Sequence, residues 1–193
     1  MDRYENVTVG LAGAGGLGSN VASILCRSGI KTLVIADHDV VQEGNLDRQF
    51  FFRDQIGMFK VDALTENLLK ISPDTSVKTH KVRLEPGRMT APFEGVDIIV
   101  EALDRKDSKA TLLREVLLGM KGVPIVACSG VAGIGGLDRV RYWKRASLHM
   151  IEDPEAPDAE KVLQTPSKVL FMAAYQSHVV MEIAEEITSR VGR

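Results

Sequence analysis

A glycine-rich turn directly after a short apolar run constrains this chain more than any other feature. The run at 7–11 (VTVGL) is typical of a buried strand, and the residues after it lead into a helix expected over 17–28. Within the turn, Gly13, Gly15 and Gly18 have the G-x-G-x-x-G spacing. Such a turn brings bare backbone N–H groups and a helix N-terminus up to a phosphate. Alone, it indicates a nucleotide but does not separate a dehydrogenase from an enzyme that uses ATP.

The bulk properties narrow the class of protein. A length of 193 residues suits one domain, so we expect a single domain over 1–193. A formal net charge of -2 gives no reason to expect a nucleic-acid or membrane partner. No apolar run approaches the roughly 18 residues that span a bilayer. The first strand also begins too early for a secretory signal to precede it, so we expect a cytoplasmic protein.

Strand-like and helix-like segments alternate along the rest of the chain. Strands are expected at 32–36, 76–82, 97–103, 124–129 and 137–143, and helices at 57–71, 109–120 and 167–191, with a broken helix at 84–93. A polar loop is expected at 37–52 and an acidic, mobile loop at 149–166. Apolar strands that alternate with helices predict an α/β, Rossmann-like fold: a mostly parallel sheet with helices on both faces and an antiparallel C-terminal edge.

Ligands of such sheets bind at the carboxyl ends of the strands, and several polar residues are expected to collect there. Asp37 ends the second strand about 20 residues beyond the glycine turn, where an acid can bind ribose hydroxyls. The alternative for an acid at a strand end is a solvated turn residue. Its position after a glycine turn favours the ribose role.

The loop after Asp37 departs from a dehydrogenase. It carries Asn45, Arg48 and Gln49 in N-L-D-R-Q, and Lys60 follows soon after. A nicotinamide site does not need such a group of cations, whereas a triphosphate does, because arginine and lysine can hold the charge on a leaving phosphate. The alternative is that Arg48 and Lys60 are ordinary surface charges.

Asp104 follows a buried strand at the same edge of the sheet. A carboxylate there is a natural magnesium ligand, since magnesium at phosphates is held by one or two carboxylates plus phosphate oxygens. The alternative role is the N-cap of the helix that follows.

Several sequence motifs occur in order along the chain: G-A-G-G-L-G, D-x-D-x-V, N-L-D-R-Q, D-Q-I-G-M-F-K and a strand ending in A-L-D. Together they resemble the ThiF/MoeB family, adenylyltransferases related to the ubiquitin-activating enzymes. The match runs from Val7 to about Gly136, and T-P-S-K-V-L-F-M-A-A-Y-Q near the C-terminus fits as well. The stretches V-E-A-L-D-R-K-D-S-K-A and A-C-S-G-V-A-G most resemble a short ThiF branch linked to thiamine biosynthesis.

The resemblance implies a reaction. The C-terminal Gly-Gly carboxylate of a small ubiquitin-like sulfur carrier, such as a ThiS-like protein, attacks the α-phosphate of ATP, and pyrophosphate leaves. The resemblance assigns catalysis to Arg48, Lys60 and Asp104, with Asp104 as the magnesium ligand. It assigns nucleotide binding to Gly13, Gly15, Gly16, Gly18, Asp37, Asp39, Asn45, Arg48, Gln49 and Lys60. It also implies a homodimer.

Departures from the family pattern limit these expectations. Many members carry two C-x-x-C pairs for structural zinc, but this chain has only Cys26 and Cys128, so no zinc is expected. Cys128 lies in an apolar strand and is expected to be a core residue rather than a nucleophile. Asp104 is followed by Arg105 where asparagine is frequent. The residues before the first strand are too few for the family's N-terminal helix, which supplies an arginine to the neighbouring subunit.

Three alternatives stay open. One is an ATP-dependent dehydratase of a modified tRNA base (tRNA threonylcarbamoyladenosine), whose relatives share A-x-D-x-x-x-x-K-A, although the near-neutral charge argues against a tRNA partner. Another is an NAD-dependent oxidoreductase. The third is a catalytically inert scaffold subunit, against which the presence of Arg48, Lys60 and Asp104 argues.

Overall fold

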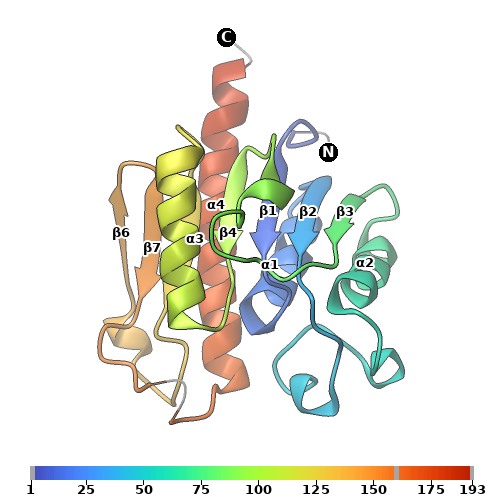
Figure 1. Ribbon diagram of the computed structural model, residues 1–193, viewed down its shortest axis with the longest axis vertical. Coiled ribbons are helices and arrows are strands. Elements are labelled where there is room, and N and C mark those ends of the chain that lie inside the picture. The colour runs from blue at the N-terminus through green and yellow to red at the C-terminus, as the bar shows by residue number, and fades with distance from the viewer. Residues whose placement is uncertain (1–2, 159–160, 192–193) are drawn as a thin grey trace.

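A seven-stranded sheet forms the centre of the protein, with strand order β3-β2-β1-β4-β5-β7-β6 (Figure 1). The computed structural model describes residues 3–158 and 161–191. Neighbouring strands run parallel except β6 and β7, which pair antiparallel at one edge. The strands are β1 Thr8–Ala12, β2 Thr32–Ala36, β3 Ser76–His80, β4 Ile98–Glu101, β5 Ile125–Ser129, β6 Arg141–Arg145 and β7 Leu148–Glu152. The predicted fold class, with its antiparallel C-terminal edge, is confirmed.

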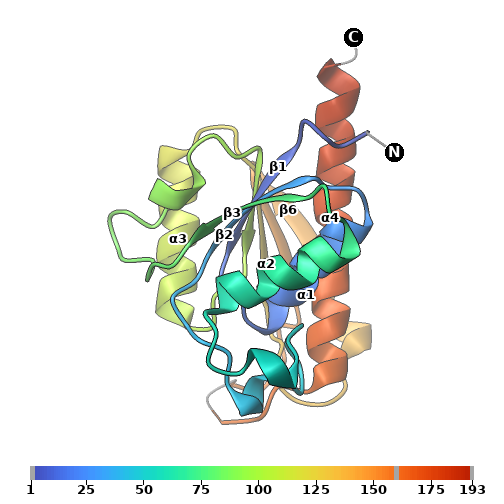
Figure 2. The same ribbon diagram turned by 90° about the vertical axis from the view of Figure 1, so that its right-hand side faces the viewer.

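Helices cover both faces of this sheet. They are α1 Gly16–Arg27, α2 Lys60–Ile71, α3 Lys106–Gly119 and α4 Pro166–Val191. Figure 2, which views the sheet edge-on, shows α1, α2 and α4 on one side and α3 on the other. Because both faces are covered, the central strand β4 is buried along its whole length instead of alternating between buried and exposed residues.

Two apolar layers fill the space between sheet and helices. One layer joins Leu11 and Ile35 of the sheet to α1, α2 and α4. The other joins Ala12 and Ala36 to α3 and to the fully buried Phe93. Successive side chains of each strand therefore point to opposite layers, as strand geometry requires.

The structure corrects several expected elements. The prediction of a loop over 149–166 is wrong for its first part. There β7 occupies Leu148–Glu152, with His149 and Ile151 buried opposite β5. The expected strand at 137–143 begins as a 3₁₀ turn and pairs only from Arg141. The expected broken helix at 84–93 contributes only a 3₁₀ turn over Ala91–Phe93.

Other boundaries also shift at the ends of elements. The helix expected from residue 57 begins at Lys60, because Gly57 has a positive φ of 91°. The strand expected to reach residue 82 ends at His80. Within the described part of the chain, no helix is both long and apolar enough to cross a membrane.

Candidate functional site

The glycine turn lies at the carboxyl end of β1, at the lower edge of the sheet in Figure 1. Gly13 has a φ of 104°, and its N–H donates to the carbonyl of Ala36 on β2. A Cβ on Gly18 would lie 1.9 Å from the carbonyl oxygen of Gly13, so α1 can pack against the turn only with glycine there. A Cβ on Gly15 would meet nothing closer than 3.9 Å, so the space in front of Gly15 is open.

Asp37 holds this turn in place. One carboxylate oxygen accepts a 2.7 Å hydrogen bond from the backbone N–H of Ala14, and the other accepts one of 2.8 Å from the N–H of Asp39. Asp37 is therefore more than a solvated turn residue. Carboxylate oxygens have further acceptor capacity, so its predicted contact with ribose is compatible with these bonds but stays a prediction.

Lys60 begins α2 and is buried, with 7% of its side chain exposed. Its Nζ lies 2.8 Å from a carboxylate oxygen of Asp39. Burial by itself would raise the pKa of Asp39, but the hydrogen bond and charge of Lys60 outweigh it, and the pKa is lowered. The interpretation of Lys60 as a surface charge is therefore wrong. It is a cation held at the edge where the glycine turn lies.

Arg48 and Gln49 approach the glycine turn from the loop after β2. Arg48 donates to the carbonyl of Gly44 at 2.9 Å and to Asp47, and its Cγ lies 3.9 Å from where a Cβ on Gly16 would be. The side-chain nitrogen of Gln49 is the atom nearest to the open space at Gly15.

Gln49 has an acceptor that suits a ligand. Its Oε1 is buried and lacks a hydrogen-bond partner within the described residues. A buried, unpaired acceptor costs free energy, so a group that donates to it would be stabilised. This orphaned oxygen, the open space at Gly15 and the nearby cations together fit a nucleotide.

Asn45 has a local structural role in the same loop. Its side-chain oxygen accepts a 3.0 Å hydrogen bond from the backbone N–H of Gln42 and closes the 3₁₀ turn Glu43–Asn45. Its predicted contact with phosphate is not visible in these bonds and remains a prediction.

Two residues of α1 that position the loop around Arg48 were not predicted from the sequence. Asn20 donates to the carbonyls of both Gly16 and Arg48, at 2.7 and 2.9 Å, and so ties the Arg48 loop to the glycine turn. Ser19 accepts a 3.0 Å hydrogen bond from the N–H of Phe50. The available signal was that both are polar residues in an otherwise apolar, buried stretch of helix.

Asp104 lies exposed in the turn after β4. The cap position of α3 is occupied by Arg105, without a side-chain cap hydrogen bond, so the N-cap role for Asp104 is wrong. Where the structure is described, the residues whose ligand atoms gather within 4.8 Å of one another are Asp37, His38 and Asp39. An exposed carboxylate at this edge suits magnesium, and Asp104 as its ligand stays a prediction.

A buried ion pair fixes the turn that carries Asp104, and the sequence did not reveal it. Glu101, whose side chain is 1% exposed, places both carboxylate oxygens 2.9 Å from Nζ of Lys109 on α3. The same carboxylate accepts a hydrogen bond from the N–H of Leu103, and Lys109 also donates to the carbonyl of Cys128. The sequence alone does not show that Glu101 is buried in an ion pair, because its partner Lys109 lies on another element.

Cys128 is buried in β5, and desolvation raises the pKa of its thiol to about 12. Because the thiolate is the nucleophile, this thiol should be inert at neutral pH. We expect Cys128→Ala to leave catalytic activity within about twofold of the unmodified chain. We also expect iodoacetamide to label the folded protein slowly and the guanidinium-unfolded protein quickly, as mass spectrometry would measure. Rapid labelling of Cys128 in the folded protein would contradict this assignment.

Comparison with known proteins decides the family. The sequence model of the ThiF family matches residues 1–184. The chain belongs to the ThiF family. The resemblance seen in the sequence motifs is therefore confirmed at the family level.

Curated relatives match part of this chain. Ubiquitin-like modifier-activating enzyme 5 of Arabidopsis thaliana is 38% identical over 128 residues, covering 56% of this chain and 30% of the relative. Adenylyltransferase and sulfurtransferase UBA4 of Eremothecium gossypii is 30% identical over 166 residues, covering 86% of this chain and 37% of the relative. The chain thus spans about a third of the length of the curated relatives it matches.

Solved structures share the fold. The tRNA N6-threonylcarbamoyladenosine dehydratase TcdA of E. coli, in complex with ATP, superposes with a TM-score of 0.83 at 18% identity, covering 97% of this chain and 88% of that one. E. coli MccB in complex with ATP gives a TM-score of 0.74 at 19% identity, covering 96% and 58%. At such identities the likeness establishes the fold only.

Proposed function

We propose that this chain is an ATP-dependent adenylyltransferase that activates the C-terminal Gly-Gly carboxylate of a small ubiquitin-like sulfur carrier. The observation that carries the proposal is the placement of two cations, Arg48 and the buried Lys60, at the edge that holds an open glycine turn. Membership of the ThiF family supports it, as does the similarity to UBA4, an adenylyltransferase and sulfurtransferase.

In the proposed reaction a carboxylate oxygen of the carrier attacks the α-phosphorus of ATP. The bond between that phosphorus and the oxygen leading to the β-phosphate breaks, and pyrophosphate leaves with the electron pair. A carboxylate is already ionised at neutral pH, so no general base is required. Catalysis then consists of positioning and of neutralising charge on the phosphates.

Each residue has a specific task in this reaction. The backbone of Gly15 and Gly16 approaches the phosphates, Asp37 binds the ribose, and Arg48 and Lys60 stabilise the charge of the leaving pyrophosphate. Lys60 exchanges its contact with Asp39 for a phosphate oxygen. Asn45, Gln49 and Asp39 complete the nucleotide contacts, and Gly13 and Gly18 shape the turn. Magnesium, bound through Asp104, would supply further charge neutralisation at the phosphates.

The finer assignments are part of the same proposal. The sequence stretches that resemble the short ThiF branch support a ThiS-like carrier and a place in thiamine biosynthesis. The family supports a homodimer, and the absence of C-x-x-C pairs supports a site without zinc. The near-neutral charge supports a protein without nucleic-acid or membrane partners, and a cytoplasmic location belongs to the same proposal.

The test is magnesium-dependent ATP–pyrophosphate exchange with purified carriers that end in Gly-Gly. We expect exchange with at least one carrier and none with the same carrier lacking its last glycine. ATP should also bind more tightly than NAD when the two compete for the site. Binding of ATP without exchange for any carrier would refute the proposal, and turnover of modified tRNA without a carrier would favour the dehydratase alternative.

A further inference from the structure

A buried ion pair at the start of α4 has no role in the chemistry proposed so far. Lys168 and Asp153 have side chains that are 3% and 0% exposed, and Nζ of Lys168 lies 2.8 Å from a carboxylate oxygen of Asp153. Lysine and aspartate are almost never fully buried unless they are paired. The burial of this ion pair is therefore explained by the chain segments that the pair joins.

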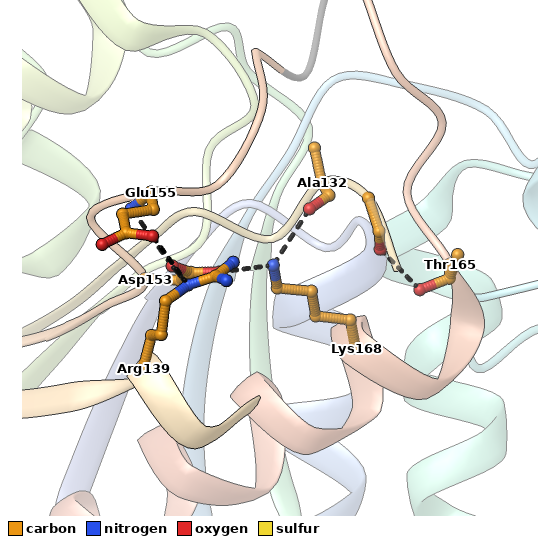
Figure 3. A network of polar contacts seen from close by, with 7 residues as sticks. Ala132, Arg139, Asp153, Glu155, Thr165 and Lys168 are labelled. Carbon is orange, nitrogen blue, oxygen red and sulfur yellow. Dashed lines mark hydrogen bonds and ion pairs between the residues drawn. The ribbon is translucent and has the colours of Figure 1, made fainter. Parts of the chain in front are cut away.

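The pair joins three separate segments of the chain, as Figure 3 shows. Lys168 belongs to α4, and its Nζ also donates to the carbonyl of Ala132 in the glycine-rich turn after β5, at 3.0 Å. Asp153 follows β7, and Arg139 contacts it at 3.4 and 3.5 Å. Burial alone would raise the pKa of Asp153, but the hydrogen bonds from Lys168 and Arg139 outweigh it and lower the pKa. The carboxylate stays charged and keeps all three segments together.

Residues 161–165, which we call the pre-α4 segment, are fixed by the same arrangement. Thr165 donates to the carbonyl of Gly133 at 3.0 Å, and the N–H of Gly133 donates to the carbonyl of Leu163 at 3.1 Å. Gly133 and Gln164 form a parallel β-bridge. The pre-α4 segment is therefore bound to the turn that Lys168 anchors through Ala132.

The pre-α4 segment reaches the glycine turn of the nucleotide site. A Cβ on Gly16 would lie 3.8 Å from Oε1 of Gln164 and 3.2 Å from the side chain of Val169, with Arg48 at 3.9 Å on the same side. Gln164 thus brings a carboxamide to the point where the backbone of Gly16 and the side chain of Arg48 meet. The atom nearest to Gly16 is the carboxamide oxygen, Oε1. Turning the carboxamide over about its terminal bond would present its N–H groups, which are donors of the kind that bind phosphate oxygens.

We propose that Gln164 binds the phosphates of ATP at Gly16 and that the buried Lys168–Asp153 pair positions it there. Gln164 is the contacting residue, and Lys168 and Asp153 are positioning residues that act through the pre-α4 segment. This inference rests on the proposed function only in that the ligand is magnesium-ATP.

The test measures magnesium-ATP affinity by isothermal titration calorimetry, together with thermal stability. The variants are Gln164→Ala, Lys168→Met, the conservative Lys168→Arg and the double variant Gln164→Ala/Lys168→Met. The matched control is Arg141→Met, which removes an exposed ion pair with Glu152 on the antiparallel β6–β7 edge.

We expect Gln164→Ala to weaken ATP binding about tenfold without a large change in melting temperature, because a hydrogen bond to a charged group is lost. Lys168→Met should weaken binding to a similar extent and also lower the melting temperature, since it leaves Asp153 without its main partner. Lys168→Arg should recover much of the affinity, and Arg141→Met should not change it. The double variant should bind about as well as Gln164→Ala alone, because the two residues act through one contact.

Two results would overturn the inference. One is unchanged ATP affinity in folded Gln164→Ala. The other is additive loss in the double variant, which would give the ion pair a purely structural role. If the unmodified chain does not bind ATP at all, the proposed function fails instead, so the two failures are distinguishable.

Discussion

Replacing Arg48 by alanine is expected to lower ATP–pyrophosphate exchange by about two to three orders of magnitude, the usual cost of losing one preorganised donor to developing charge. Within the described residues, the side chain of Arg48 donates to the neighbouring Gly44 carbonyl and the Asp47 carboxylate, so its removal should leave the fold intact. The measurement is the initial rate of exchange at saturating ATP and carrier, with circular dichroism as the check on folding. Arg48→Lys should recover part of the rate, because lysine keeps the charge but not the planar fork.

The matched control for Arg48 is Arg53→Ala. Arg53 is in the same region of the chain, is well exposed and pairs with Glu43 on the surface. The Arg53→Ala variant should retain the exchange rate of the unmodified chain. Unchanged exchange in Arg48→Ala would place the catalytic charge elsewhere, whereas absence of exchange in the unmodified chain would favour the inert scaffold.

Gly18→Ala is expected to lower the free energy of unfolding by about 2 kcal/mol or more. Alanine within a helix normally gains about 1 kcal/mol over glycine. Here the added Cβ would lie 1.9 Å from the carbonyl oxygen of Gly13, which is backbone and cannot move without opening the turn. The clash therefore outweighs the gain in helix propensity. Urea unfolding of both proteins at one temperature measures the difference.

Gly15→Ala provides the matched control, because it makes the same substitution in the same turn. Its φ of -83° suits alanine, and no atom lies closer than 3.9 Å to the new Cβ. The free energy of unfolding should fall by no more than about 1 kcal/mol, the cost of alanine at a helix N-cap. ATP affinity should fall about tenfold nevertheless, because the methyl group occupies the space assigned to the phosphates. Equal stability of the two variants would contradict the packing argument.

The sequence was sufficient for the fold and for the edge of the sheet where the site lies. Parallel strands bring their carboxyl ends to one edge, so Asp37 and the glycine turn could be placed together from order alone. The sequence could not show that the side chain of Lys60 is buried, because its burial depends on Asp39 packing against the start of α2. Glu101 and Lys168 were missed for the same reason. Each is buried with an oppositely charged partner on another element, and local patterns do not record such pairs.

The strand β7 was missed for a different reason. Its residues Leu148–Glu152 adjoin an acidic, proline-containing stretch, and the composition of that stretch obscured a short alternation of buried and half-buried residues. The strand is specified by its register with β5, where His149 lies opposite Val126. That register is a tertiary property of the chain.

In the described part of the chain, the four α-helices begin on the side of the sheet where the glycine turn lies, at Gly16, Lys60, Lys106 and Pro166 (Figure 1). Each helix N-terminus carries a partial positive charge of about half an elementary charge. The helix ends therefore contribute a positive electrostatic field at this edge, although the chain has a formal net charge of -2. Such a field draws an anion toward the edge before any side chain touches it, and dissolved salt weakens the attraction. We expect the helix ends to assist the arrival of the proposed nucleotide, and the residues at the glycine turn to determine how long it stays bound.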